Sequence, residues 1–400
     1  MRPFAGRRIL LGVTGGIASY KTTWLARLLH KAGADVDVVL SRSAREFVGA
    51  VTFEALTGRP VHSELVATGH ALDHITLARG ADTIVVAPAT ADFIARCAHG
   101  NADDLLSAIL LAARAPVLLV PAMNDQMWSH RQTQANVAHC RDIGYTVLDP
   151  DVGDLAAGEG AGPGRMPEPE TIFAHAGRLL EKPSLRGRTV VVTAGPTREA
   201  IDPVRFLSNR SSGRMGVAIA AAAWRRGASV TLVHGPLEVA LPAGPRAIAV
   251  ETTELMRDAV AQAAGSADAL IMAAAPADFR AANVADQKIK KNGAPPAIAL
   301  ASAPDILVET RGARKPGAVV VGFALETQDA LANARQKLQS KGLDAVVIND
   351  ALEPGAAFGS ETNRVTLLFA DGRTTELPMM SKVELADVLL DRVEEILGGR

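Results

Sequence analysis

Residues 14–21 have the residue types of a phosphate-binding turn. They follow a short apolar run and open a helical pattern, so unpaired backbone N–H groups and the positive helix end could bind a phosphate. The sequence spacing from Gly15 to Lys21 and Thr22 matches that of an ATP-binding P-loop. However, Tyr20 replaces the obligatory glycine of that motif and would block the backbone cradle. We therefore expect phosphate binding without a P-loop; the alternative is a tight turn with no ligand.

Two more segments of the first half place small and polar residues directly after apolar runs. Residues 87–90 read Ala-Pro-Ala-Thr, and Asn124 lies in a second such segment, residues 121–128. Small residues and hydroxyls can approach a flat cofactor closely, and a carboxamide can donate and accept hydrogen bonds. Each residue alone is more often structural, so only the set indicates a site.

His70 and His74 are four residues apart, which is the spacing of a helical zinc pair. We disfavour a zinc site, because no third cluster of ligands lies nearby and His62 is as readily explained as a solvated side chain. The metal ligands of this chain are therefore unknown from the sequence.

A long polar loop of the second half could bind another anion. Residues 195–216 contain hydroxyls, glycines and arginines, with Asn209 among them, and precede a helix expected from about Met215 to Arg226. This position, after the first strand of the half, is where such folds bind phosphates. The alternative is an irregular surface connection.

Charged and aromatic residues after later apolar runs could bind a nucleotide. Lysines would neutralise a triphosphate, Phe323 could stack on a base, and Asp278 or Asp305 could accept from ring or sugar donors. Taken alone, the lysines of residues 288–291 are a solvated run, and Lys337 with Lys341 form an exposed helical stripe.

The elements that must position these residues are strands alternating with helices. Short apolar, β-branched runs alternate with longer helical patterns, which predicts parallel sheets with helices on both faces. Ligands bind beyond the carboxyl ends of strands in such sheets. The expected strands are residues 9–13, 36–40, 84–87, 117–120, 190–193, 230–233, 270–273, 319–323 and 346–348.

The two halves repeat one pattern. GRRILLGVTGG near the start returns as GRTVVVTAG, and each is followed by a helix ending in Gly-Ala and an alternating strand. We expect an α/β chain of two doubly wound, Rossmann-like domains, residues 1–182 and 183–400, because a charged, proline-containing stretch at residues 181–184 interrupts the pattern.

Composition argues against several classes of function. The 42 Lys+Arg balance 43 Asp+Glu, without interleaved aromatic residues, so nucleic-acid binding is not expected. We expect no membrane association, because no apolar run approaches about 20 residues and the start does not read as a signal peptide.

The two cysteines, Cys97 and Cys140, lie in helical patterns and favour a reducing, cytoplasmic location. A GxGxxG dehydrogenase turn is absent, and Ser41 stands where its acid would lie.

As a set, the motifs of the first half resemble the homo-oligomeric, flavodoxin-like, flavin-containing cysteine decarboxylases. The shared motifs are GGIAxYK, the DHI histidine, PATAD, PxMNxxMW and a glycine-rich segment ending in GRM. The resemblance implies that His74 is the catalytic base and that Asn124 positions the substrate carboxylate. The FMN-binding residues that it implies are Gly15, Gly16, Ile17, Ala18, Ser41, Ala87, Pro88, Ala89 and Thr90.

The chemistry of that family is a decarboxylation through oxidation. A hydride passes from the carbon bearing the thiol to FMN, which gives a thioaldehyde that can accept the electrons left when CO2 departs, and the hydride later returns. His74 would act on the thiol proton, since an imidazole titrates near neutral pH.

The glycine-rich segment departs from the family pattern. The family usually reads ACG before GRM, and its cysteine protonates the enethiolate, but Ala157 stands here, with one extra residue. Alanine cannot donate a proton. Glu159 or water could protonate instead, the register could differ, or the last step could be lost. The expected substrate flap comprises Ala157, Gly158, Glu159, Arg165 and Met166.

The second half resembles phosphopantothenate–cysteine ligase over nearly its whole length. The shared motifs are TAGPTRE, DPVRFxSNxSSGxMG, AAxADF, KIKK, GFAxET and QKLxxKGLD, with Leu325 where alanine is common. The resemblance implies that Asn209 acts in turnover of an acyl-cytidylate, and Lys288 would offset charge on the departing pyrophosphate from a loop able to close. The implied CTP contacts are Ala274, Asp278, Lys288, Pro304, Asp305, Ile306, Leu307, Phe323, Lys337 and Lys341.

Together the resemblances imply a bifunctional enzyme of coenzyme A biosynthesis. The ligase would couple 4′-phosphopantothenate to cysteine with CTP and Mg²⁺, releasing CMP and pyrophosphate. The decarboxylase would convert the resulting 4′-phosphopantothenoylcysteine to 4′-phosphopantetheine and CO2. A homo-oligomer built from trimers of the flavin domain is expected, as in the family. The alternative, prompted by Ala157, is a ligase whose flavin domain binds FMN only for assembly.

Overall fold

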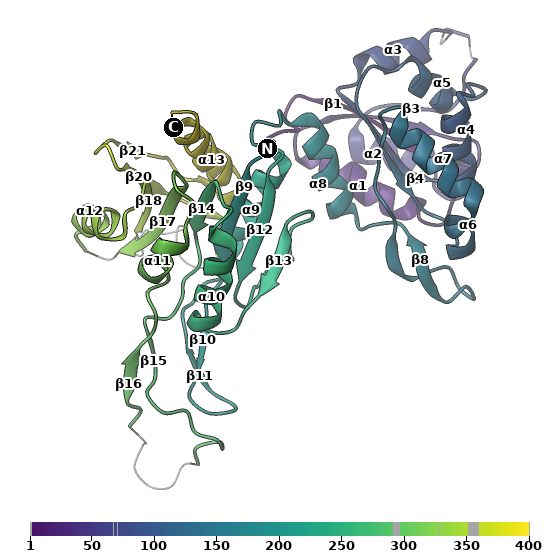
Figure 1. The fold of residues 1–400 in the computed structure, drawn as a ribbon. Helices are drawn as coiled ribbons and strands as arrows, with labels where there is room; N and C mark the ends of the chain where they lie inside the picture. The colour runs from purple at the N-terminus through teal and green to yellow at the C-terminus, as the bar shows by residue number, and fades with distance from the viewer. Residues whose placement is uncertain are drawn as a thin grey trace. The chain divides into compact units, whose positions relative to one another are not determined.

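The structure is a computed structural model that describes residues 2–66, 68–69, 71–290, 297–326, 328–350 and 360–399. The chain forms two compact units, Met1–Lys182 and Pro183–Arg400 (Figure 1). Among the described residues, none of the helices combines the length and the apolar character that crossing a membrane requires.

The first unit is built on a parallel sheet whose strands lie in the order β3-β2-β1-β4-β5-β6. The order reverses between β1 and β4, so the carboxyl ends of these two strands form a switch point for ligand binding. The strands are β1 (Arg8–Val13), β2 (Asp35–Leu40), β3 (Val61–His62), β4 (Thr83–Ala89), β5 (Val117–Pro121) and β6 (Thr146–Val147), and a separate hairpin comprises β7 (Asp151–Asp154) and β8 (Ala161–Arg165).

Helices cover both faces of this sheet. The helices are α1 (Ser19–Lys31), α2 (Ala50–Thr57), α3 (Asp73–Gly80), α4 (Ala91–His99), α5 (Leu105–Ala112), α6 (Asp125–Ser129), α7 (Arg131–Asp142) and α8 (Pro169–Leu180). Ile9 and Leu11 pack with α1, α2 and α8, whereas Leu10 packs with α3, α4, α5 and α7. Both faces of β1 are therefore buried, which explains why its sequence is a continuous apolar run.

The second unit repeats the same order and then extends it. Its sheet reads β13-β12-β9-β14-β17-β18-β20-β21, in which the first six strands are parallel and β20 and β21 are antiparallel. The switch point lies between β9 and β14. The strands are β9 (Thr189–Ala194), β12 (Ser229–His234), β13 (Arg246–Ala249), β14 (Ala269–Met272), β17 (Val319–Glu326), β18 (Ala345–Asp350), β20 (Val365–Phe369) and β21 (Thr374–Glu376).

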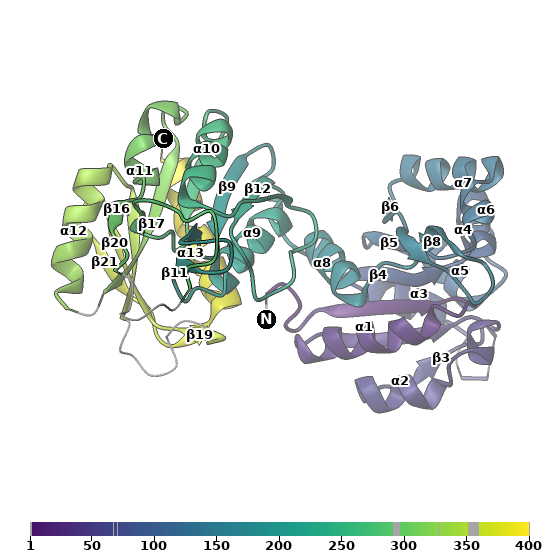
Figure 2. The same ribbon diagram turned by 90° about the horizontal axis from the view of Figure 1, so that it is seen from below.

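The helices of the second unit also divide between the two faces (Figure 2). They are α9 (Arg214–Arg225), α10 (Thr253–Ala264), α11 (Ile306–Glu309), α12 (Ala330–Lys341) and α13 (Lys382–Gly398). One core contains residues of α9 and α13, and the other contains residues of α10, α11 and α12. The helix predicted after the polar loop is confirmed as α9.

Buried charges fix α13 on α9. Arg225 and Arg226 both pair with Asp387, and Arg226 also contacts Asp391 at 2.8 Å and Glu394 at 2.9 Å. The Arg226 side chain is only 3% exposed. Removing one partner of such a cluster would leave a buried charge unpaired, so the cluster holds the two helices in one arrangement.

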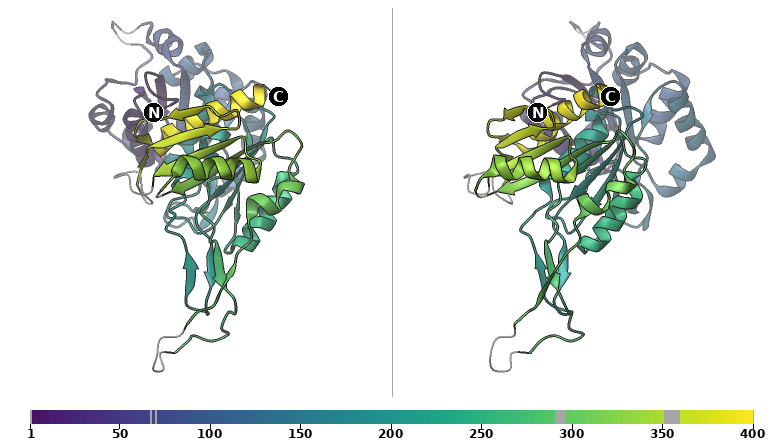
Figure 3. Two further views of the ribbon diagram at one scale, coloured as in Figure 1. Left: turned by 90° about the vertical axis from the view of Figure 1, so that its left-hand side faces the viewer. Right: turned by 60° about the vertical axis from the view of Figure 1, so that its left-hand side comes forward.

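The nine predicted strands are confirmed, but the antiparallel edge and the short ribbons were not predicted. Two ribbons, β10 (Arg198–Ala200) with β11 (Phe206–Ser208) and β15 (Phe279–Ala281) with β16 (Leu300–Ser302), project from the sheet of this unit (Figures 1 and 3). A third pairs β19 (Thr362–Asn363) with β22 (Met380–Ser381). Strands of two or three residues give too little periodicity for prediction.

His175 on α8 makes the stability of the first unit depend on pH. Burial, followed by the nearby charge of Arg178, lowers its pKa from 6.5 to about 4. Between pH 6.5 and pH 4 the unfolded chain binds more protons than the folded chain. The contribution of neutral His175 to the free energy of unfolding should therefore be fully present above pH 6.5, and up to roughly 3 kcal/mol should be lost as the pH drops through 4. His175→Gln should flatten this dependence in calorimetry, whereas the exposed His139→Gln should not; equal slopes would contradict the prediction.

Candidate active sites

A cavity of about 670 Å³ lies at the switch point of the first unit. This volume is in the range of pockets that bind small molecules and cofactors. Its walls come from the turn after β1, the ends of β4 and β5, and the β7–β8 hairpin. Predicted site residues that line it are Gly15, Gly16, Ile17, Ala18, Pro88, Thr90, Asn124, Ala157, Glu159, Arg165 and Met166.

The turn after β1 presents backbone donors to this cavity. A Cβ at Gly15 would lie 2.3 Å from the Cβ of Ser43, so only glycine fits there. Ala18 caps α1 without a side-chain hydrogen bond, and the N–H groups of Ser19, Tyr20 and Lys21 donate to carbonyls of the preceding turn. Among the described residues, the N–H groups of residues 15–18 have no such backbone partner and are the donors that a ligand could use. Thr14 Oγ1 donates to Pro88 O at 2.8 Å and accepts from Thr90 N at 3.1 Å, so it ties the ends of β1 and β4 together.

Asn124 has a fixed orientation at the start of α6. Its Oδ1 accepts a hydrogen bond from Gln126 N at 2.9 Å and so caps the helix. Because the carbonyl oxygen has this partner, the donating NH2 group is the part of the carboxamide left for a ligand.

The β7–β8 hairpin is anchored at its base and forms a wall of the cavity. A Cβ at Gly164 would lie 2.1 Å from Met123 O, so the hairpin packs directly on the segment that carries Asn124. Lys21 Nζ donates to Met166 O at 3.1 Å and to Glu168 at 2.9 Å. The hydrogen bond from Lys21 is the main reason why the pKa of Glu168 is below its usual range.

Some predicted residues of the first unit lie outside this lining. His74 is in the first turn of α3, and its buried Nδ1 has no hydrogen-bond partner among the described residues. Ser41 Oγ accepts from Ala44 N at 3.2 Å, so it stabilises the turn after β2. Ala87 and Ala89 are completely buried in β4, and Gly158 is exposed on the hairpin loop.

The structure does not bring together a zinc site in the described part of the chain. No group of three or more metal-ligating side chains is found there. His62 Nδ1 lies 3.5 Å from Asp73 Oδ2, so His62 is paired with a carboxylate and is not simply solvated. His70 lies outside the described residues.

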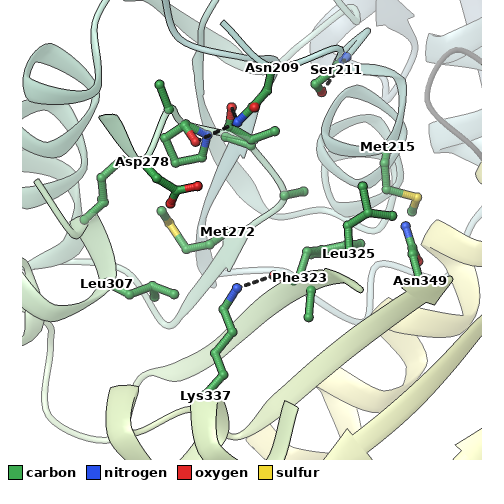
Figure 4. A pocket seen from close by; sticks show the side chains of 18 of the residues that line it. Asn209, Ser211, Met215, Met272, Asp278, Leu307, Phe323, Leu325, Lys337 and Asn349 are labelled. Atoms are coloured by element: carbon green, nitrogen blue, oxygen red, sulfur yellow. Dashed lines mark hydrogen bonds between the residues drawn. The ribbon is translucent and has the colours of Figure 1, made fainter. Parts of the chain in front are cut away.

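A second cavity, of about 560 Å³, lies at the switch point of the second unit (Figure 4). It collects residues from the loop before α9, the ends of β14, β17 and β18, the start of α11, and one face of α12. Predicted residues that line it are Asn209, Ala274, Asp278, Pro304, Asp305, Ile306, Leu307, Phe323, Lys337 and Lys341.

Asn209 is held at the rim by two backbone carbonyls. Its Nδ2 donates to Ala275 O at 3.2 Å and to Pro276 O at 2.9 Å. Both amide hydrogens are therefore used, and Oδ1 is the atom of this side chain that remains available to accept a hydrogen bond from a ligand.

The lysines of α12 are tied to the neighbouring elements. Lys337 Nζ donates to Phe323 O at 2.6 Å, and Lys341 Nζ pairs with Asp305 at 2.9 Å. Burial alone would raise the pKa of Asp305, but the ion pair with Lys341 keeps it below its ordinary value. Asp278 and the two lysines thus surround one end of the cavity with fixed charge.

Lys288 does not line this cavity in the structure. Lys288 is exposed. The backbone of the adjacent Ile289 is held in place by Asp202, whose side chain is fully buried. Asp202 accepts from Ile289 N at 3.1 Å, and Arg205 Nη2 donates to Ile289 O at 2.8 Å. The Arg205 guanidinium is the main cause of the strongly lowered pKa of Asp202. Lys291 lies outside the described residues.

Comparison with known proteins assigns the family. The chain is 42% identical over 402 residues to the coenzyme A biosynthesis bifunctional protein CoaBC of Vibrio vulnificus, and the alignment covers 100% of both chains. This chain belongs to the CoaBC family. It is also 46% identical to the CoaBC protein of Mycobacterium tuberculosis H37Rv, over 98% of this chain and 97% of that one.

The two units of the CoaBC-family chain match two family models. A flavoprotein model matches residues 2–180, and a model of the DNA/pantothenate metabolism flavoprotein C-terminal domain matches residues 185–397. A crystal structure of the C-terminal domain of CoaBC is 37% identical, with 55% of this chain and 100% of that one covered and a TM-score of 0.47. A crystal structure of the FMN-dependent cysteine decarboxylase SpaF is 30% identical, with 44% and 98% covered and a TM-score of 0.38.

Proposed function

We propose that the second unit couples 4′-phosphopantothenate to L-cysteine with CTP, and that the first unit decarboxylates the product with FMN. The observation that carries the ligase assignment is the second cavity. Nine of the ten residues expected to contact CTP line it, although they come from four separate segments of the chain. Such convergence at a switch point supports a nucleotide site.

The ligase chemistry begins with activation of a carboxylate. The carboxylate oxygen attacks the α-phosphorus of CTP, the bond to the bridging oxygen breaks, and pyrophosphate leaves with the electron pair. The amine of cysteine then attacks the acyl carbon, and CMP leaves. Mg²⁺ would enter the cavity with the triphosphate, whose oxygens are suitable ligands.

The residues of the first cavity fit FMN. The N–H groups of residues 15–18 and the positive end of α1 can hold its phosphate, and Met123, Met127 and Met166 provide an apolar wall for its ring. When bound, FMN supplies a reversible two-electron oxidation. The NH2 group of Asn124 would then hold the substrate carboxylate beside the ring.

His74 remains our proposed base, although it lies outside the cavity of its own unit. A homo-oligomer in which α3 of one copy faces the cavity of another would resolve this, and trimers of the flavoprotein unit are the arrangement we propose. Leu72, which precedes α3, is an apolar side chain that is 68% exposed in the single chain.

A single assay tests both activities. The purified chain is incubated with phosphopantothenate, cysteine, CTP and Mg²⁺, and CMP and CO2 are measured together. Equal amounts of CMP and CO2 are expected. CMP without CO2 from an FMN-containing protein would support the second candidate, a ligase with an assembling flavin domain, which Ala157 favours. Absence of CMP would refute the ligase assignment.

Glu159 is our proposed proton donor for the last step of the decarboxylation. It lines the cavity next to the position where Ala157 replaces a cysteine. Glu159→Gln should slow release of saturated product by about tenfold to a hundredfold, with oxidised aminoenethiol accumulating. The double variant that combines Glu159→Gln with Ala157→Cys should restore the rate of this release. Mass spectrometry of the products distinguishes the two forms. Unchanged product from Glu159→Gln would assign the proton to water.

Lys288 is expected to act on the departing pyrophosphate, and Asp202 to hold its segment. Lys288→Gln should lower turnover by about 10²-fold with the fold intact, because a charge that offsets the leaving group is lost. Asp202→Asn should lower turnover less, by loosening the anchor at Ile289. Pyrophosphate release is the readout, and Lys315→Gln, outside the cavity, is the control. Release at the unaltered rate from Lys288→Gln would refute the role.

A further inference from the structure

The second cavity has an end that the CTP contacts named above do not use. It is lined by Arg214 at the start of α9, Asn349 at the end of β18, Asn363 on β19 and Lys382 at the start of α13. Figure 4 shows Asn349 and Met215 on the side of the pocket opposite Asp278 and Leu307. Four segments that are distant in sequence therefore meet at this end.

Polar atoms at this end have no partner in the described part of the chain. Asn363 is only 2% exposed, and its Oδ1 accepts no hydrogen bond there. Asn349 Oδ1 and Arg214 Nε are also buried and unpaired among those residues. Leaving buried polar groups unpaired is costly, and three of seven such atoms lie at one end of one cavity. A ligand that accepts from Arg214 Nε and donates to the two carboxamide oxygens would satisfy them.

The described residues at this end carry positive charge. No described carboxylate forms an ion pair with Arg214 or Lys382. Burial, and then the charge of Arg214, lowers the pKa of Lys382. The positive end of α9, a twelve-residue helix, adds to the field. Anionic oxygens match the two cations and the Arg214 Nε donor, and water molecules of a cation bound to such a ligand can donate to the two carboxamide oxygens.

We propose that Arg214, Asn349, Asn363 and Lys382 form a subsite for the terminal phosphates of the nucleotide. This rests on the proposed ligase function. With the base and ribose at the Asp278 and Lys337 end, the phosphate chain extends past the start of α9 toward these residues. The subsite would then hold the group that leaves as pyrophosphate, and it would stabilise the negative charge that this group gains.

The phosphate of 4′-phosphopantothenate has the same chemistry, so the test must separate the two sources. We choose Lys382→Gln, which removes one charge, and Asn363→Leu, which replaces an unpaired carboxamide by an apolar side chain of similar size. Arg392→Gln, on the same helix and outside the cavity, removes one charge as a control. Titration calorimetry measures binding of CTP, CMP, pyrophosphate and phosphopantothenate.

Both variants should bind CTP and pyrophosphate about tenfold more weakly, with CMP and phosphopantothenate unchanged. Asn363→Leu should not lower the melting temperature, because no hydrogen bond is lost on folding; a merely structural asparagine would predict a loss. Equal weakening for CTP and CMP, weakening only for phosphopantothenate, or no weakening would overturn the proposal. Failure of the wild-type chain to use CTP would instead refute the ligase assignment, so the two failures are distinguishable.

Discussion

Asn209→Asp should reduce amide formation by about 10²- to 10³-fold while the decarboxylase activity stays intact. The wild-type carboxamide donates to two backbone carbonyls, at 3.2 and 2.9 Å, and thereby aims its Oδ1 toward the cavity. A carboxylate cannot donate to these carbonyls and is repelled by them, so the side chain must leave this position. The amine of cysteine then loses the acceptor that orients it.

The expected signature is a block after activation. Rapid-quench experiments should show about one equivalent of pyrophosphate per site, formed at nearly the unaltered rate, with acyl-cytidylate accumulating when cysteine is present. Asn333→Asp, on the exposed side of α12, changes the same functional group outside the cavity. Normal amide formation by Asn209→Asp, or loss of the pyrophosphate burst, would contradict a role in the second step.

Asn124→Asp should reduce CO2 release from 4′-phosphopantothenoylcysteine by about 10²- to 10³-fold and leave the ligase unaffected. Aspartate is an equally good helix cap, so its oxygen can keep the hydrogen bond from Gln126 N. The second oxygen, however, replaces the NH2 group and faces the substrate carboxylate. The change thus exchanges attraction for repulsion without removing the cap.

The fold control for this variant is its flavin. FMN absorbance and the melting temperature of the first unit should match the wild type, and the exposed Asn101→Asp should behave normally. Mixing Asn124→Asp with His74→Gln chains also tests the proposed oligomer, because mixed assemblies would contain some cavities with both residues intact. CO2 release at the wild-type rate by Asn124→Asp, with FMN bound, would show that Asn124 has no role in the decarboxylation.

The sequence by itself determined the doubly wound architecture of both units. Parallel strands buried on both faces require continuous apolar runs, and these runs located nine strands without any structure. It also determined most of the site composition. Residues that directly follow parallel strands meet at one edge of the sheet, so Thr90, Asn124 and Asp278 could be expected near ligands from their positions alone.

Only the tertiary structure decided which of these residues share a cavity. Lys288 and His74 match family motifs as well as Asn209 does, yet neither lines the cavity of its unit. Asn363 and Lys382 match no motif used above, and they reach the second cavity because the chain reverses at β20 and α13 docks on α9 through Arg226 and Asp387. Local patterns report the burial of each segment, whereas the meeting of distant segments depends on how helices and sheet edges pack.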